Sequence, residues 1–216
     1  MTNNQYTKTA IVLHWLIGLG ILVMLGLGWY MADLPKDAPK AMSFDLFDLG
    51  IYNWQLSEEA SPRTVYFNLH KSIGVTLLGL IALRIFWRLT HRPPALLETL
   101  TAVEKKIATA GHHSLYLLMI AMPLTGVLMT LYSKYGLKWF CVDVFSGLDK
   151  PAMRDIFKEA HEALATVFAV VIAVYLINAV PPTQSHSVLA GPRLAICNVS
   201  PEAIVTLLFV FVSSGL

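Results

Sequence analysis

The sequence predicts an all-α fold, a four-helix bundle that spans a membrane. Hydrophobic residues make up 56% of the 216-residue chain and charged residues only 14%, which leaves too little polar surface for a water-soluble globule. Four apolar segments are each long enough, or nearly so, to cross a hydrocarbon core, which needs about 20 helical residues. They lack the period-two alternation of strands, and an open sheet cannot satisfy its backbone hydrogen bonds in lipid.

The first segment is too long for the hydrophobic region of a signal peptide and lacks a convincing cleavage site, so we interpret it as a helix. The second is interrupted only by His70 and Lys71 before its basic end. Pro123 should kink the third, and the double proline at 181–182 should end the fourth. The predicted helices are 9–32, 64–89, 106–133 and 160–180.

The distribution of Lys and Arg predicts the orientation of these helices. The segment from Arg84 to Lys106, which runs from the end of the second helix to the start of the third, holds five basic and two acidic residues, whereas the first connection is rich in Asp and Glu. The N-terminus and the second connection should therefore face the cytoplasm, and the first and third connections should face outward. We expect one membrane domain over residues 1–180, followed by a divergent tail over 181–216 with a short apolar segment.

Three histidines lie inside the predicted membrane helices, where an ionisable side chain is costly and therefore a functional candidate. His70 and His161 lie near the outward starts of the second and fourth helices, at one depth, and His14 lies near the cytoplasmic start of the first. Two imidazoles facing each other at one depth are what bis-histidine ligation of a haem iron requires. A single interfacial histidine would need no such explanation. No Cys-x-x-Cys-His motif is present, so a haem would be bound noncovalently.

A second site is nearly complete at the depth of His14. Fourteen helical residues rise about 21 Å and return to within roughly 40° of the same face, which places Tyr175 below His161. A histidine at position 175 would close a second bis-histidine site with His14, but tyrosine is a poor substitute for imidazole in an electron-transfer haem. His112 lies at a similar depth and remains an alternative ligand, although we favour a place for it near a haem propionate or a quinone.

Several short motifs, in their order and spacing, carry a family resemblance over roughly the first 178 residues. They are Leu13-His14-Trp15, Leu69-His70-Lys71-Ser72-Ile73-Gly74, Gly111-His112, Pro123-Leu124-Thr125-Gly126 and His161-Glu162-Ala163-Leu164-Ala165. The chain resembles the bacterial cytochrome b561 family, which includes superoxide oxidase, and more loosely the b-type cytochrome subunit of Ni/Fe hydrogenases.

The resemblance implies a di-haem cytochrome b that uses haem b. Histidines matching His70 and His161 bind the outward haem in such proteins, and the one matching His14 binds the inward haem with a partner at the position of Tyr175. Our candidate cofactor and iron ligands are therefore His14, His70 and His161, with the inward haem in doubt because of Tyr175. No catalytic side chain is expected, since the haem carries the redox chemistry.

The resemblance also implies a multi-pass protein of the bacterial inner membrane with a cytoplasmic N-terminus. The expected function is respiratory electron transfer, in which superoxide is oxidised at the outer face and ubiquinone is reduced. The chain would be a superoxide:quinone oxidoreductase if both haems bind. Expected partners are membrane lipid, quinone, and superoxide or a redox partner protein; no nucleic acid is expected.

Two alternatives remain open. The chain is an electron-relay subunit for a partner dehydrogenase or hydrogenase, or it is a defective remnant that holds only the outward haem. Five basic residues near the outward site favour a small anionic donor by focusing the electric field, although the acidic first connection opposes this. They are Lys71, Lys134, Lys138, Arg154 and Lys158. Arg84 and Arg88 share one helix face and either contact propionates or quinone oxygens or anchor the helix end.

Overall fold

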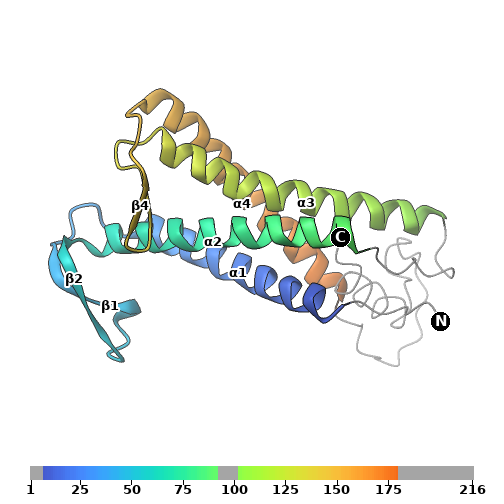
Figure 1. The fold of residues 1–216 in the computed structure, drawn as a ribbon, viewed down its shortest axis with the longest axis horizontal. Coiled ribbons are helices and arrows are strands. Elements are labelled where there is room, and N and C mark those ends of the chain that lie inside the picture. The colour runs from blue at the N-terminus through green and yellow to red at the C-terminus, as the bar shows by residue number, and fades with distance from the viewer. Residues whose placement is uncertain (1–6, 92–101, 180–216) are drawn as a thin grey trace, which may run out of the picture. The chain divides into compact units, whose positions relative to one another are not determined.

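The computed structural model describes residues 7–91 and 102–179, and Figure 1 shows their fold. The described residues form four long helices and two short hairpins, and the predicted tail over 181–216 lies outside them. This mostly helical architecture confirms the predicted fold class. The helices are α1 (Lys8–Asp33), α2 (Pro62–Thr90), α3 (Ala102–Leu131) and α4 (Pro151–Ala179).

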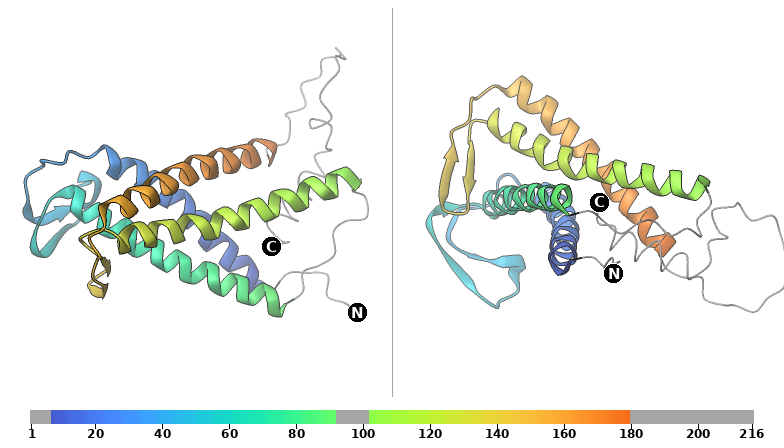
Figure 2. Two further views of the ribbon diagram at one scale, coloured as in Figure 1. Left: turned by 90° about the horizontal axis from the view of Figure 1, so that it is seen from above. Right: turned by 45° about the vertical axis from the view of Figure 1, so that its right-hand side comes forward.

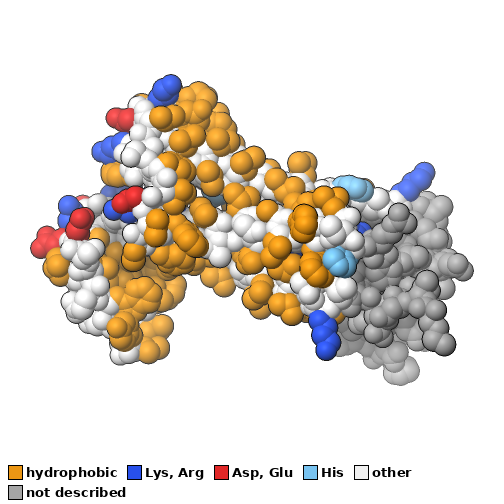
Figure 3. Space-filling model, in the orientation of Figure 1, with side chains coloured by type: hydrophobic (Ala, Val, Ile, Leu, Met, Phe, Trp, Pro, Cys, Tyr) orange, Lys and Arg blue, Asp and Glu red, His pale blue; other side chains and the backbone are white. Residues whose placement is uncertain are grey.

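Each of these helices contains a segment that is long and apolar enough to cross a membrane. At most 17% of the residues in the most apolar stretch of each helix are buried by the protein itself. Most of these apolar side chains are therefore exposed, and Figure 3 shows hydrophobic side chains over the visible surfaces of the helices. Helices satisfy their own backbone hydrogen bonds, so such surfaces can face lipid, and the chain is a multi-pass membrane protein.

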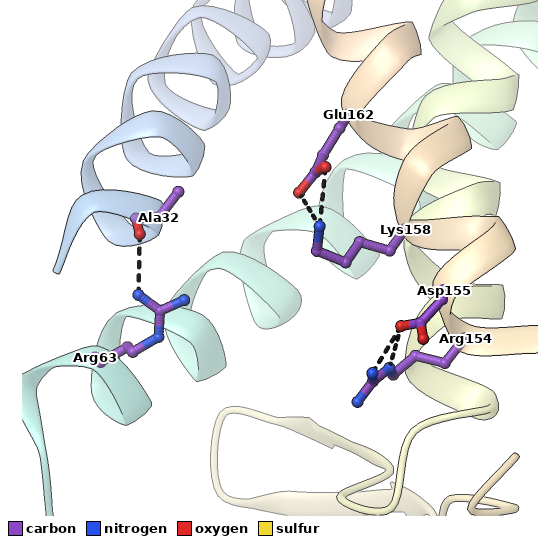
Figure 4. Close-up of polar contacts among 6 residues, drawn as sticks. All are labelled: Ala32, Arg63, Arg154, Asp155, Lys158 and Glu162. Carbon is purple, nitrogen blue, oxygen red and sulfur yellow. Dashed lines mark hydrogen bonds and ion pairs between the residues drawn. The ribbon is translucent and has the colours of Figure 1, made fainter. Parts of the chain in front are cut away.

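The fourth helix begins earlier than the predicted start at 160. Pro151 is its first residue. Proline suits this position, because the backbone N–H that it lacks would have no partner within the helix. The added turns are charged and exposed, and Figure 4 shows that Arg154 pairs with Asp155 and Lys158 with Glu162. The apolar pattern therefore predicts only the membrane part of α4. The helix begins before that part, in a polar extension at its N-terminal end.

The connection between α1 and α2 forms an antiparallel hairpin. Its strands are β1 (Ala41–Asp45) and β2 (Asn53–Ala60), joined through the short 3₁₀ helix η1 (Leu46–Asp48). Arg63, at the start of α2, fixes the end of α1, where helix carbonyls lack intrahelical partners. Its guanidinium donates to the carbonyl oxygens of Met31, Ala32 and Leu34 at 3.1, 3.0 and 2.7 Å, and Figure 4 shows the contact with Ala32.

The connection between α3 and α4 forms the second hairpin, from β3 (Leu137–Trp139) and β4 (Val142–Phe145). It is fastened to α2 by Ser72, which is 1% exposed. The Ser72 hydroxyl accepts a hydrogen bond from the Phe140 N–H at 2.8 Å and lies 3.3 Å from the Lys138 carbonyl oxygen. Figures 1 and 2 show this hairpin beside α2.

Packing divides the chain into two compact units. The hairpin unit comprises Gly18–Gly79 and Met122–Glu162, with both hairpins. The terminal unit comprises Met1–Ile17, Leu80–Ala121 and Ala163–Leu216. In the hairpin unit, Leu27, Phe44 and Tyr66 form a buried cluster that joins β1 to α1 and α2.

Candidate haem sites

The hairpin unit brings His70 of α2 and His161 of α4 together. The centroids of the two imidazole rings are 6.3 Å apart, and the ring planes meet at 81°. A metal–imidazole bond is about 2.0–2.1 Å, as known for zinc, so two rings on opposite sides of one metal have centroids roughly 6 Å apart. The separation of His70 and His161 therefore suits one metal ion held between them.

His161 is oriented by the part of α3 around Pro123. Its Nδ1 lies 2.9 Å from the Met122 carbonyl oxygen and 3.1 Å from the Thr125 hydroxyl. Because the carbonyl can only accept, Nδ1 carries the ring proton and Nε2 keeps its lone pair. A backbone acceptor on one nitrogen is the usual support for a histidine that ligates a metal through the other.

His70 fits a ligand role by a different observation. Its Nδ1 is buried, and no hydrogen-bond partner for it exists among the described residues. A buried polar atom without a partner is costly and calls for an explanation, such as a bound group. An iron bound to His70 Nδ1 would supply that partner.

Each of these two histidines also rests on a glycine of a neighbouring helix. A Cβ added at Gly28 of α1 would lie 3.4 Å from His70 Cε1, and one added at Gly126 of α3 would lie 3.0 Å from His161 Cε1. The missing side chains let the imidazoles lie against the helix backbones. We call these two positions glycine seats.

The terminal unit presents a different set around His14 of α1. Arg84 is 6% exposed. Its Nη2 lies 3.3 Å from Nδ1 of His14, and its Nη1 donates to the Ala10 carbonyl oxygen at 3.1 Å. A guanidinium can only donate, so His14 Nδ1 accepts and the ring proton is at Nε2. This state is the reverse of that of His161, and Nε2 is not prepared to bind a metal.

Tyr175 of α4 occupies a third glycine seat, at Gly111 of α3. A Cβ added at Gly111 would meet the Tyr175 hydroxyl and lie 3.1 Å from Tyr175 Cζ. The phenol thus takes the same place on α3 in this unit that the His161 imidazole takes in the hairpin unit. With a phenol in this seat and His14 bonded to Arg84, the residues described in the terminal unit do not fit bis-histidine ligation of a haem.

His113 does not change this conclusion. His113 places Nδ1 2.8 Å from the Thr109 carbonyl of its own helix and is exposed. The side chain of His112, the alternative ligand, lies outside the described set. Among the described residues, no three His, Cys, Asp or Glu side chains gather as a metal site, whereas a haem needs only two axial ligands from the protein.

The basic residues near His161 are largely neutralised. Lys138 pairs with Asp143 at 3.6 Å, in addition to the two ion pairs along α4. Lys134 stacks over the ring of Tyr135, and Lys71 donates to the Gly136 carbonyl oxygen at 3.3 Å. Lys71, which follows His70 in the chain, is the partly buried member of the five.

Comparison with known proteins decides the family. A family model described as Prokaryotic cytochrome b561 matches residues 5–183. The chain belongs to this family. It is 28% identical over 151 residues to Cytochrome b561 homolog 2 of Escherichia coli (strain K12), a match that covers 70% of this chain and 66% of that protein. It is 24% identical over 180 residues to Probable superoxide oxidase CybB of Yersinia pestis, covering 82% of this chain and 88% of that protein.

Membership of the cytochrome b561 family makes this chain a membrane haem protein of electron transfer. The structure adds residues around the histidines that the sequence reasoning did not identify. These are the glycine seats at Gly28 and Gly111, the Met122 carbonyl and the Thr125 hydroxyl. The glycines at 111 and 126 follow nearly the same spacing as positions 161 and 175, and that pattern is readable in the sequence.

Proposed function

We propose that this cytochrome b561 binds one haem b in the hairpin unit, where His70 and His161 would hold it. The observation that carries this proposal is the 6.3 Å separation of the two rings, with His161 Nδ1 bonded to a backbone carbonyl. A haem b held there supplies a one-electron couple between ferric and ferrous iron. The glycine seats exclude side chains from the space beside both ligands.

We further propose that superoxide is the electron donor and ubiquinone the acceptor. The net reaction converts two superoxide anions, one ubiquinone and two protons into two dioxygen molecules and one ubiquinol. The similarity to Probable superoxide oxidase CybB supports this choice. Lys71 supports it as well, because a partly buried ammonium next to His70 attracts a small anion more strongly than a solvated one does.

The proposal includes an orientation of the chain in the membrane. The hairpin unit faces the outside of the bacterial inner membrane, and the N-terminus faces the cytoplasm. Basic residues in the connection between α2 and α3 support this orientation. An outward site next to lipid gives access both to superoxide in water and to quinone in the membrane.

The test is superoxide-driven reduction of a water-soluble ubiquinone by the purified chain in detergent. Ubiquinol formation that stops when superoxide dismutase is added, and that is lost in His161→Ala, supports the proposal. A normal haem spectrum with no superoxide-dependent ubiquinol would reject superoxide as the donor while leaving the haem assignment intact.

A specific observation favours a second candidate, an electron relay for a partner dehydrogenase or hydrogenase. Carboxylates of the connection between α1 and α2 are exposed in the hairpin unit, and Figure 3 shows acidic side chains at that end with Lys and Arg side chains among them. They are Asp37, Asp48, Glu58 and Glu59. Such a surface repels superoxide and suits a basic redox protein. Copurification of a large redox partner, with no superoxide-driven reaction, would favour the relay.

The position of Tyr175 supports a third candidate, a remnant that holds the outward haem alone and has lost the electron-transfer reaction. Haem content tests whether the chain holds one haem instead of the two that the family resemblance implies. Activity tests whether electron transfer has been lost. One haem per polypeptide with no electron transfer from any donor to quinone would favour the remnant over both other candidates.

A further inference from the structure

The first hairpin ends in an exposed apolar tip, which we define as residues 49–54. Ile51 is 80% exposed and Tyr52 67% exposed, and Leu49 and Trp54 are 60% and 47% exposed. The rings of Tyr52 and Trp54 lie 6.4 Å apart, so the tip presents one joined aromatic surface. Large apolar side chains that gather at an exposed point commonly mark a contact with a membrane or another molecule.

The tip is held beside the helices because η1 packs onto two helical tyrosines. The Phe47 N–H donates to the Tyr66 hydroxyl at 2.7 Å, and the Phe47 ring lies 5.3 Å from the rings of Tyr66 and Tyr30. Phe47 and Asp48 both have positive φ angles, 58° and 51°, which side chains other than glycine adopt at a cost. These contacts offset that cost and fix where the tip begins.

The depth of those tyrosines places the tip at the membrane surface. α2 has 29 residues and is therefore about 43 Å long, which matches the roughly 40–45 Å of a bilayer with its headgroups. Tyr66 lies about 6 Å from the start of α2, and Tyr30 lies in the last turn of α1. The chain continues from η1 directly into residues 49–54, so the tip lies alongside the interfacial turns of two membrane helices.

The chemistry of the tip fits a lipid interface better than water. Tyrosine and tryptophan prefer the headgroup level, where an apolar ring meets a polar edge. Residues 41–62 contain no Lys or Arg, so the tip has no attraction for anionic lipid in particular. The acidic Glu58 and Glu59 lie at the other end of β2, and Figure 3 shows hydrophobic side chains over the free end of this hairpin.

We propose that residues 49–54 insert into the headgroup region of the adjacent leaflet and anchor the first hairpin to the membrane. The occupant of this surface is glycerophospholipid, and the surface continues the lipid-facing surface of α1 and α2 in the hairpin unit. The hairpin thus follows the membrane surface near the two histidines, with its acidic end toward water.

The experiment measures the depth of the tip in the full-length protein. A nitroxide spin label is attached at Ile51→Cys in a Cys141→Ser and Cys197→Ser background, in phosphatidylcholine vesicles. Collision with oxygen, which concentrates in lipid, is compared with collision with a nickel chelate, which stays in water. We expect oxygen to dominate at position 51. The matched control is Ser57→Cys, an exposed position on β2, where the nickel chelate should dominate.

Tyr52→Cys provides a second label site in case the first variant folds poorly, and it should also favour oxygen. Dominance of the nickel chelate at both tip positions would overturn the proposal. Low collision with both reagents at both positions would mean that a protein, such as a second copy of this chain, covers the tip, and that result would overturn the lipid assignment too. Neither outcome depends on haem, so the proposed function is tested separately.

Discussion

The two units share one arrangement of α3 and α4 but place a different ring in it. In each unit a residue of α4 rests on a glycine of α3: His161 on Gly126 in the hairpin unit, and Tyr175 on Gly111 in the terminal unit. The hairpin unit has an imidazole whose Nδ1 is bonded to a carbonyl, and the terminal unit has a phenol. The scaffold thus places a ring against a glycine of α3 in both units, whether that ring is an imidazole or a phenol.

Removing the ligand of the hairpin unit should have the largest effect. His161→Ala should abolish the low-spin haem signal completely, because the described residues of the terminal unit include no bis-histidine set to hold a second haem. The measurement is haem per polypeptide by pyridine haemochrome, with reduced-minus-oxidised spectra of the purified protein. An unchanged low-spin spectrum in this variant would reject the assignment of His70 and His161.

The matched control for that change is His113→Ala. His113 is exposed and bonded to its own helix at Thr109, so its loss should leave haem content and spectrum unchanged. Equal losses in both variants would point to general misfolding instead of ligand removal.

The next largest effect should come from Tyr175→His, which gives the terminal unit a second histidine to pair with His14. The Gly111 seat already accepts a ring, so an imidazole there should face His14 and raise haem content from one to two per polypeptide. Haemochrome stoichiometry and a redox titration with two components would show the gain. Binding of the iron requires the Arg84 contact with His14 to give way, which the new iron–nitrogen bond favours.

Tyr175→Phe serves as its control, because it keeps the ring and removes the hydroxyl without adding a ligand. It should stay at one haem per polypeptide. Two haems in the unaltered protein would show that Tyr175 or His112 already completes a second site, and the contrast between the units would disappear.

The sequence predicted the helices and the histidine pair for clear physical reasons. Apolar runs of membrane length leave a helix as the stable form, and the shared depth of His70 and His161 follows from their places in helices that begin on the same side. The same periodicity placed Tyr175 one membrane leaflet away from His161. Local patterns thus define both the scaffold and the candidate ligand positions.

The hairpins and the supports of the histidines could not be predicted in the same way. β1 and β2 pair through backbone hydrogen bonds, and η1 depends on Phe47 meeting Tyr66 from another element. The bond between His161 and the Met122 carbonyl joins two helices through a backbone atom, which every residue type possesses. Such contacts depend on three-dimensional packing and leave little trace in one sequence.

A smaller effect should follow from filling a seat in the hairpin unit. In Gly126→Ala the new Cβ would lie 3.0 Å from His161 Cε1, which forces the imidazole to shift. Such overpacking costs about 1–3 kcal/mol, so haem affinity should fall by roughly 5- to 150-fold. Haem-transfer titration measures this loss. Gly79→Ala is the matched control, since its added Cβ meets no atom from another element within 4 Å, and the haem affinity of this variant should not change.

The smallest effect tests what holds the second hairpin near the histidines. Ser72→Ala removes the acceptor of the Phe140 N–H and the contact with the Lys138 carbonyl, two residues along α2 from His70. We expect a loss of about 0.5–1.5 kcal/mol in unfolding free energy, because one neutral hydrogen bond contributes about that much. Thermal unfolding in detergent measures it, with exposed Ser57→Ala as the control. Faster proteolysis at residues 137–145 with haem content unchanged would show that Ser72 fastens the hairpin to α2 without holding the ligands in place.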